Sequence, residues 1–251
     1  MLSNYKFSYW KLSGLFILSF FVIGNTNVYS QNFKLKVSGG YYFYSLNSLK
    51  QSLIYLNEYN IEWNKIPSKI TDNFPNYFMG EIGIEYDVSE LYSIGFFFGY
   101  QETGGRIHYK DYSGEFSDKI TLGRQTFGFD NSLNIPEFFE ENTIVSFGIS
   151  LIYVRFKFSE DQLLRLNGIE FSTNHSESTD NSYAGISPFF QIGYKFGFYN
   201  FSIRTGYDIL IDLENFYKEG YWDYYSIHGY EYNGAKIAIS CSLDLNHFFE
   251  Q

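Results

Sequence analysis

Stretches of alternating apolar and polar residues recur along most of the chain. Each is about ten residues long, the length that a tilted β-strand needs to cross a bilayer. The eight stretches run over residues 34–44, 77–88, 91–103, 119–135, 143–158, 182–196, 201–213 and 234–249. The pattern predicts an all-β fold, an eight-stranded antiparallel up-and-down transmembrane β-barrel with long extracellular loops.

The connections between these stretches alternate in length. Long connections are expected at 46–75, 104–118, 159–181 and 214–233, and short ones at 89–90, 137–142 and 197–200, with Pro136 ending the strand before the second short turn. In outer-membrane barrels the short turns face the periplasm and the long loops face the cell exterior. The sequence therefore predicts four extracellular loops, of which 159–181 carries a polar, exposed tip at residues 173–180.

Three local features of the pattern need separate interpretation. Leu46, Leu49, Leu53 and Leu56 have helical spacing, which makes a short amphipathic helix plausible in the first long connection. Gly104-Gly105 is expected to start or interrupt the second long connection. The alternation of the fourth strand breaks at Ile120 and Leu122, where a β-bulge is one explanation.

The two faces of the strands differ in chemistry. One face carries Ile, Leu, Val, Phe and Tyr with almost no charge, whereas the other carries Gly, Ser and charged residues. Periodicity alone does not say which face points inward, and a soluble lipocalin-like barrel has a similar strand count. Because water would not select for an uncharged outer face, the pattern favours a barrel with lipid outside and a polar lumen.

Charged residues of both signs are expected at two depths of this lumen. The periplasmic half is predicted to contain Lys36, Glu85, Asp130, Arg204 and Asp244, and the opposite half Glu81, Arg124, Asp208 and Lys236. We expect two layers of ion pairs that fill the lumen, with Glu85 and Arg204 coupled to each other. Removing one partner of a buried pair typically costs about 3–5 kcal/mol.

Composition supports the same class of protein. The chain of 251 residues is 22% aromatic, with 28 Phe, 25 Tyr, 22 Gly and only 4 Pro. Its net charge of −10 argues against nucleic acid or anionic lipid as a main partner. Cys241 is the single cysteine, so no intramolecular disulfide can form.

The first thirty residues have the features of a signal peptide. Lys6 and Lys11 precede an apolar segment, residues 14–24, that is too short to span a bilayer as a helix. Val28 and Ser30 are small residues that suit a cleavage site after Ser30. We therefore expect a signal peptide at 1–30 and an outer-membrane β-barrel domain at 31–251, with an N-terminal membrane anchor as the alternative.

Candidate chemistry is sparse. The candidates considered were the histidines His108, His175, His228 and His247, the segment His175-Ser176-Glu177, the loop acids Asp111, Asp180, Glu214 and Asp223, and the pair Glu81 and Glu85. Neighbours in sequence point in different directions and cannot by themselves form a catalytic triad. No His pair has convincing metal-ligand spacing. The sequence thus predicts no catalytic, cofactor-binding or metal site and no cofactor, and Cys241 is expected to face lipid.

The chain resembles the outer-membrane β-barrel domain proteins of Bacteroidetes, a porin-like and OmpA-like superfamily. The resemblance rests on the signal ending before Gln31, the eight strands, and Phe248-Phe249 close to the C-terminus. It implies a location in the cell outer membrane of a Gram-negative bacterium. It also implies outer-membrane lipid and the barrel-assembly machinery as partners, although Glu250-Gln251 after the terminal aromatics departs from the usual assembly signal.

Two classes of function remain open. The first is a non-enzymatic barrel with a side-chain-plugged lumen and a structural, assembly or surface-interaction role, which would bind another envelope or surface protein through its loops. The aromatic segments 221–225 and 61–63 are plausible contact surfaces. The alternative is a small porin-like pore or an outer-leaflet lipid-modifying barrel enzyme.

Overall fold

A computed structural model describes residues 32–135, 142–175, 181–212 and 232–246. Its elements are β1 (Asn32–Tyr44), α2 (Asn47–Glu62), β2 (Lys69–Asn73), β3 (Tyr77–Ser89), β4 (Tyr92–Lys110), β5 (Gly114–Ile135), β6 (Thr143–Leu166), β7 (Ile169–His175), β8 (Asn181–Phe196), β9 (Tyr199–Asp212) and β10 (Gly234–Asp244). No helix among these residues is both long enough and apolar enough to cross a membrane.

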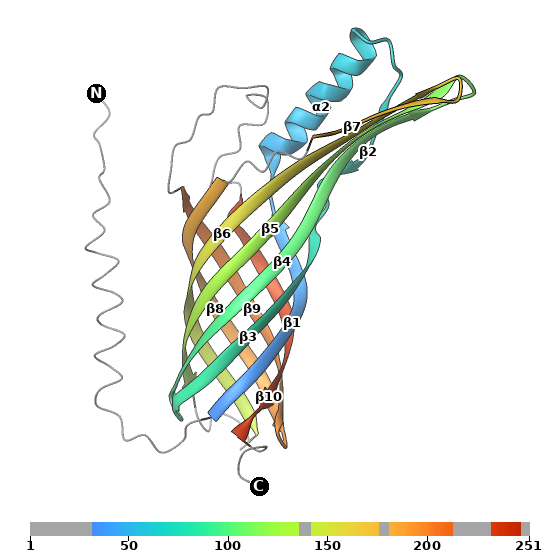
Figure 1. The fold of residues 1–251 in the computed structure, drawn as a ribbon. Coiled ribbons are helices and arrows are strands. Elements are labelled where there is room, and N and C mark those ends of the chain that lie inside the picture. Colours follow the sequence, from blue (N-terminus) through green and yellow to red (C-terminus); the bar gives the residue numbers. More distant parts are fainter. Residues whose placement is uncertain (1–31, 136–141, 176–180, 213–231, 247–251) are drawn as a thin grey trace, which may run out of the picture.

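Eight of the strands close into a barrel (Figure 1). The ring runs β1, β3, β4, β5, β6, β8, β9, β10 and back to β1, and every pairing is antiparallel. Closure leaves no free strand edge in the wall, which is the condition for a sheet to span a bilayer. The predicted eight-stranded up-and-down barrel is confirmed.

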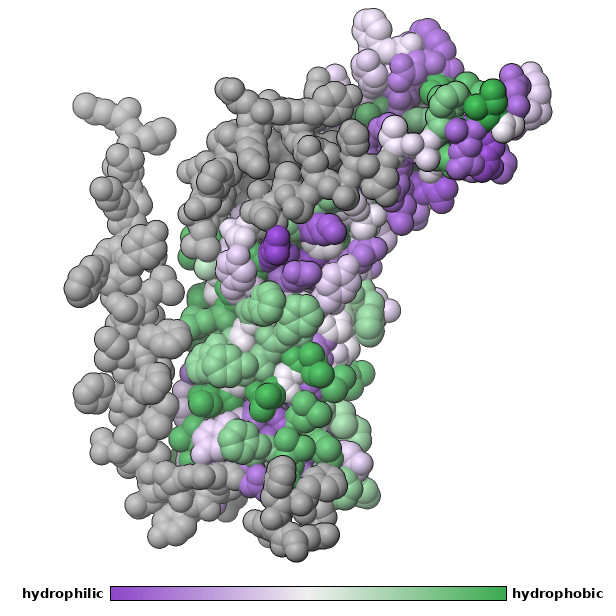
Figure 2. Space-filling model, viewed as in Figure 1, coloured by the Kyte–Doolittle hydropathy of each residue, from purple (hydrophilic) through white to green (hydrophobic). Residues whose placement is uncertain are grey.

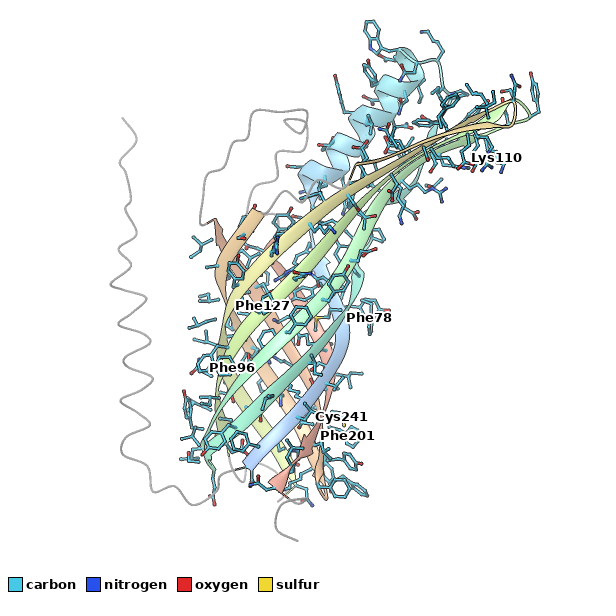
Figure 3. The ribbon with its side chains drawn as sticks, in the orientation of Figure 1. Phe78, Phe96, Lys110, Phe127, Phe201 and Cys241 are labelled. Atoms are coloured by element: carbon cyan, nitrogen blue, oxygen red, sulfur yellow. The ribbon has the colours of Figure 1, made fainter. Side chains whose placement is uncertain are left out.

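The outer wall is apolar around its lower half. Phe78, Phe96, Phe127 and Phe201 project outward from different strands (Figure 3), and Phe78 and Phe96 are more than 60% exposed. Figure 2 shows hydrophobic residues grouped over this part of the wall. Since the lumen is lined by charged and hydroxyl side chains, the apolar face points to lipid and the soluble-barrel alternative is excluded.

Three strands continue far beyond the apolar belt. β4, β5 and β6 lean away from the barrel, and β2 and β7 pair with β4 and β6 at either side (Figure 1). We call these five strands above the belt the extracellular sheet. The predicted loops 104–118 and 159–181 are therefore largely hairpin strands, and β2 was not anticipated in the sequence.

Two sequence expectations are wrong within this sheet. Gly104 and Gly105 do not interrupt the strand: β4 continues to Lys110 in register with β5. A Cβ atom at Gly105 would lie 2.8 Å from Leu53 Cδ2 and 2.7 Å from Phe74 Cε2, so the glycine allows the helix and the chain after it to pack closely.

The break in alternation at Ile120 and Leu122, for which a bulge was one explanation, is not a bulge, because β5 pairs with β4 and β6 without a register shift. Both side chains instead point inward and are buried in an apolar core. Helix α2 completes this core with Leu49 and Leu53, which confirms the helix predicted from leucine spacing.

Several predictions concern residues outside the described ranges. These are the signal peptide, the Pro136–Glu141 part of the turn after β5, the 176–180 part of the polar tip, most of the 214–233 connection, and Phe248-Phe249. β10 ends at Asp244, five residues before the predicted end of the last strand.

Candidate functional site

A cluster of charges joins opposite walls of the lumen beneath the apolar core. Asp208 on β9 accepts hydrogen bonds from Arg124 Nη2 on β5 and Tyr42 Oη on β1, each at 2.6 Å. Lys236 Nζ on β10 lies 3.1 Å from the other Asp208 oxygen. All four side chains are at most 3% exposed. The single carboxylate of Asp208 pairs with both buried cations, and a neutral residue at position 208 would leave them without this counter-charge.

A second cluster lies nearer the short turns. Arg204 on β9 makes a two-pronged contact with Asp130 on β5, with Nη–Oδ distances of 2.5 and 3.0 Å. Arg204 Nη2 also donates to Ser150 Oγ at 2.7 Å, and its guanidinium lies 3.6 Å from the ring centre of Phe189. The fork of the guanidinium fits a carboxylate in this way, so the pair fixes both distance and orientation across the lumen.

A third group of charges lies at the short-turn end. Lys34 Nζ contacts Glu85 at 3.3 Å and Asp87 at 2.7 Å, and Lys36 lies 3.9 Å from Glu85. The expected coupling of Glu85 to Arg204 is wrong, because Arg204 is paired with Asp130.

Both signs occur at each depth as predicted, but the partners differ in part. Lys34 and Asp87 were not anticipated, although their alternation with Lys36 and Glu85 on the same face was visible in the sequence. Glu81 and Asp244 form no ion pair shorter than 4 Å with any residue that the structure describes.

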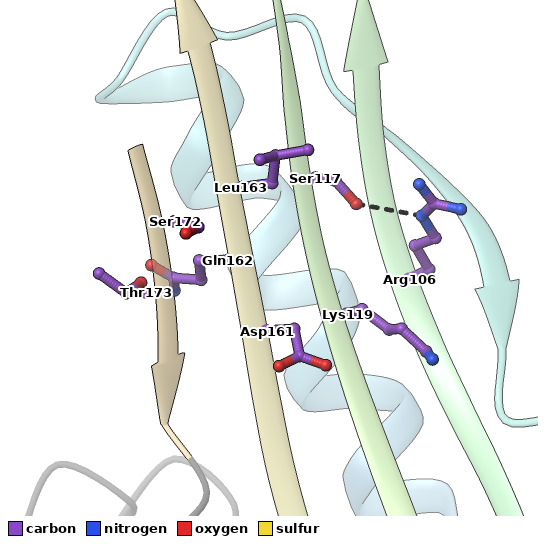
Figure 4. Close-up of a pocket in the computed structure, with 8 residues that line it drawn as sticks. All are labelled: Arg106, Ser117, Lys119, Asp161, Gln162, Leu163, Ser172 and Thr173. Atoms are coloured by element: carbon purple, nitrogen blue, oxygen red, sulfur yellow. Dashed lines mark hydrogen bonds between the residues drawn. The ribbon is translucent and has the colours of Figure 1, made fainter. Parts of the chain in front are cut away.

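The extracellular sheet carries a hollow of about 370 Å³ on the face away from α2 (Figure 4). Its lining on this face is Arg106, Ser117, Lys119, Asp161, Leu163 and Ser172, and it also borders Gln162 and Thr173, which by strand alternation belong to the opposite face. Arg106, Lys119 and Asp161 lie side by side on β4, β5 and β6 by strand register. Arg106 Nε donates to Ser117 Oγ at 3.1 Å. Sequence analysis missed this hollow because it expected loops at these positions.

A buried pair of carboxyl groups lies on the opposite face of the same sheet. Asp118 is 1% exposed and Glu160 is 8% exposed, and Gln162 Nε2 reaches both, at 3.4 Å from Asp118 and 2.6 Å from Glu160. Burial, and secondly the neighbouring Glu160 charge, raise the pKa of Asp118 to about 7. Asp118 therefore takes up a proton near neutral pH while an exposed aspartate would stay ionised.

Of the chemical candidates from the sequence, the described residues include His108, His175, Asp111, Glu81 and Glu85. The others lie outside the described residues, namely Ser176, Glu177, Asp180, Glu214, Asp223, His228 and His247. His108 Nε2 contacts Glu115 at 3.2 Å at the outer end of the sheet, while its register neighbour Ser117 bonds Arg106. Among the described residues, no three His, Cys, Asp or Glu side chains are placed to hold a metal ion. Glu85 is paired with lysines, and Cys241 lies on the outer wall in register with Val37 and Phe201.

Of the two aromatic contact segments, one lies in the described part of the chain. Trp63, at the end of α2, is 73% exposed, and Ile61 is 43% exposed. Asp111, one of the loop acids, accepts hydrogen bonds from Tyr109 and Ser113 in the β4–β5 turn, and these lower its pKa to about 2. It therefore stabilises the turn locally.

Comparison with known proteins gives likeness in fold alone. No family model matches the chain, and no curated protein matches it. Among solved structures, it is similar to Neisserial surface protein A, with 9% identity over 85% of this chain and 98% of that one, at a TM-score of 0.41. The attachment invasion locus protein of Yersinia pestis gives 8% identity over 84% and 97%, at 0.38. The translocator domain of the autotransporter NalP from Neisseria meningitidis gives 10% over 94% and 95%, at 0.29.

The strand pairing and the apolar belt define the class by themselves. An even number of antiparallel strands, short turns at one end, long connections at the other and lipid-facing aromatics are the features of outer-membrane barrels. The protein is an outer-membrane β-barrel protein of a Gram-negative bacterium. Its long-connection end, with α2 and the extracellular sheet, is the end that such barrels expose outside the cell.

Proposed function

We propose that the protein is a non-enzymatic, non-conducting barrel whose role is carried by its extracellular sheet and helix. The observation that supports a closed lumen most strongly is the Arg124–Asp208–Lys236 cluster, which reaches from β5 to β9 and β10. Eight-stranded barrels leave an interior that side chains can fill. A second crossing by Arg204 and Asp130 lies below it.

Conductance in planar bilayers tests this proposal. The wild-type protein should give no stable openings at any voltage that the bilayer tolerates. The double variant Arg124→Ala/Lys236→Ala removes the two cations and should be the first to conduct, if it still shows heat-modifiable mobility in detergent gels. Stable large-conductance openings in the wild type would contradict a plugged lumen and favour a small pore.

The part of the protein above the membrane offers a surface for interaction. The extracellular sheet has two outer strands, β2 and β7, and α2 presents the exposed aromatic Trp63. We propose that this surface binds another envelope or surface component. Crosslinking through a photoreactive residue at position 63, compared with one at the membrane-facing position 239, would identify a protein partner. Equal products at both positions would argue against a specific contact.

The proposal includes export and assembly. Residues 1–30 would be removed as a signal peptide, leaving Gln31 first, and the barrel-assembly machinery would insert the chain. N-terminal sequencing of outer-membrane material checks the cleavage site. Protein that begins upstream of Gly14 would favour the alternative of an N-terminal anchor. We further propose that the chain belongs to the Bacteroidetes-type barrels that its sequence resembles.

A further inference from the structure

The extracellular sheet has an outward face that is more positive than the chain as a whole. Outward positions alternate along each strand, and those above the belt on β4, β5 and β6 can be assigned from the register with Phe98, Phe127 and Tyr153. The charged side chains at these positions are the cations Arg106, Lys110, Lys119, Arg155, Lys157 and Arg165 and the anions Glu102, Glu115 and Asp161.

On these three strands six cations therefore face three anions, in a protein with a net charge of −10. The overall charge, which by itself argues against an anionic lipid as partner, conceals this local excess of positive charge. On the flanking strands β2 and β7, Lys69, Asp72 and Glu170 share this face by register with His108, Arg106 and Arg165, so the five strands together carry seven cations against five anions. This local excess decides binding at short range because charges beyond about 10 Å are screened.

Pairing separates two parts of this face. At the outer end, Glu115 contacts Lys110 at 3.0 Å and Arg165 at 3.6 Å, and Arg165 also contacts Glu170. Closer to the belt, neither the Arg106 guanidinium nor the Lys119 ammonium forms an ion pair with any described residue. These two cations occupy neighbouring register positions, where Cβ atoms are about 4.5–5.5 Å apart.

The hollow provides hydrogen-bonding groups around the two cations. Ser117 and Ser172 contribute hydroxyl groups, and Asp161 contributes a carboxylate beside Lys119 (Figure 4). Arginine and lysine together suit phosphate or carboxylate, and Asp161 can accept hydrogen bonds from sugar hydroxyls. The hollow has no aromatic residue in its lining, so it lacks a stacking platform for a nucleobase.

The lean of the extracellular sheet indicates where a ligand would come from. α2 covers the sheet on one side, and the face with the hollow is the continuation of the lipid-facing wall (Figure 1). Lys119 lies eight residues beyond Phe127 on β5, roughly 26 Å along the strand. Because the strands tilt strongly, this face overhangs the membrane surface beside the barrel, and the exposed Arg155 and Lys157 lie between the belt and the hollow.

We propose that the hollow binds the anionic saccharide headgroup of a glycolipid in the surrounding outer leaflet, with Arg106 and Lys119 contacting its phosphate or carboxylate groups. This inference rests on the proposed surface-interaction function and names one partner for it. It would fix the leaning sheet to the membrane surface and thereby hold α2 and its aromatic end at a defined height.

Native mass spectrometry of the detergent-purified barrel, titrated with rough-type lipopolysaccharide that has a phosphorylated core, tests the proposal. Arg106→Gln/Lys119→Gln should weaken the apparent affinity at least tenfold. The matched control, Lys110→Gln/Arg165→Gln, removes the same charge from the paired outer end and should change it less than threefold. Heat-modifiable mobility confirms that both variants are folded, and the single variants Arg106→Gln and Lys119→Gln should each give an intermediate loss.

Two further ligands distinguish the source of the binding energy. Dephosphorylated lipopolysaccharide should bind the wild type as weakly as intact lipopolysaccharide binds the double variant. Lipid A alone, which lacks the saccharide core, should bind the wild type and the double variant equally. Equal affinity of both double variants for intact lipopolysaccharide would overturn the proposal, as would an undiminished loss with lipid A alone. Neither result depends on conductance, so a plugged lumen could still hold.

Discussion

The strands β4, β5 and β6 bury opposite kinds of side chain in their two halves. Within the membrane, their inward positions carry polar residues such as Asp130 and Ser150, and their outward positions carry phenylalanines. Above the membrane the inward positions include an apolar core, for example Ile107, Ile120 and Phe158, beside the buried acids Asp118 and Glu160. Arg124 and its partners lie where the two kinds of interior meet.

The strand register explains how the inward positions change from polar to apolar along the same strands. β5 pairs with both neighbours without a shift along its whole length, so inward and outward positions keep the same alternation throughout. The polarity of the side chains changes, while the geometry of the strand does not. Each half thus places apolar groups against its least polar surroundings, which are lipid outside the lower half and α2 inside the upper half.

The largest expected effect is on the stability of the membrane-spanning half of the barrel. Asp208→Asn leaves Arg124 and Lys236 buried without a counter-charge and should lower the free energy of unfolding by about 3–5 kcal/mol. Urea unfolding of the barrel in detergent measures this loss of unfolding free energy. Asp244→Asn is the matched control, since Asp244 forms no ion pair below 4 Å among the described residues, and it should cost under about 1 kcal/mol. Equal losses would show that the cluster is not special.

The next largest effect is on the stability of the extracellular half. Leu53→Ala removes a fully buried side chain from the core under α2 and should cost about 2–5 kcal/mol locally. Because this core lies above the membrane, α2 should become sensitive to protease while heat-modifiable mobility of the barrel persists. Glu58→Ala, at an exposed position of the same helix, should have little effect. Simultaneous loss of the barrel would contradict the separation of the two halves.

A pair of substitutions sharpens the comparison on the outer surface. Ile239→Arg places a charge midway along β10 on the lipid-facing wall and should cost about 2–4 kcal/mol. Ser159→Arg places the same side chain on the outward face of β6 above the belt, where the cost should stay within about 0.5 kcal/mol. Refolding into bilayers at increasing urea compares the two. Similar losses of stability for the two variants would show that the membrane boundary assigned between these positions is wrong.

The last prediction concerns the pH dependence of stability that Asp118 causes, which is the smallest of the expected changes when it is counted per pH unit. Its pKa in the folded protein is about 7, above its ordinary value of 3.8, so the folded state holds a proton that the unfolded state has lost between these values. Stability of the extracellular half should therefore fall as pH rises from about 4 to 7, by up to about 1.4 kcal/mol per pH unit, and level off above it.

Loss of α2 helicity on heating, followed by circular dichroism at several pH values, checks this dependence. Asp118→Asn removes the titrating group and should give a flatter profile, with the greatest gain over the wild type at high pH. Glu115→Gln, which removes an acid on the outward face of the same strand, serves as the control. A wild-type profile that rises with pH would contradict a buried proton on Asp118.

The predictions from sequence were most accurate for strands whose surroundings stay the same along their whole length. Strands such as β3, β8 and β9 were placed within one or two residues, because lipid on one side and a polar lumen on the other impose a strict period of two. Leucine spacing likewise located α2. The ion pairs were predicted by sign and depth, but which charge meets which required the curvature of the wall.

The errors lie where the surroundings of a strand change along its length. Ile120 and Leu122 looked like a defect because the same face is polar lower down, and Gly104-Gly105 looked like a break because glycine usually ends strands. Both are consequences of a helix that packs on the inner face of the sheet. A local pattern contains no information about a covering element that lies fifty or more residues away.

The sequence by itself determined that eight strands cross a membrane, since alternation of lipid-facing and lumen-facing residues is written into each strand separately. Tertiary structure alone decided that Arg204 meets Asp130, that Arg106 and Lys119 stand side by side over a hollow, and that Asp118 shares its burial with Glu160. Those contacts join residues on different strands, and their distances follow from register, tilt and closure of the whole sheet.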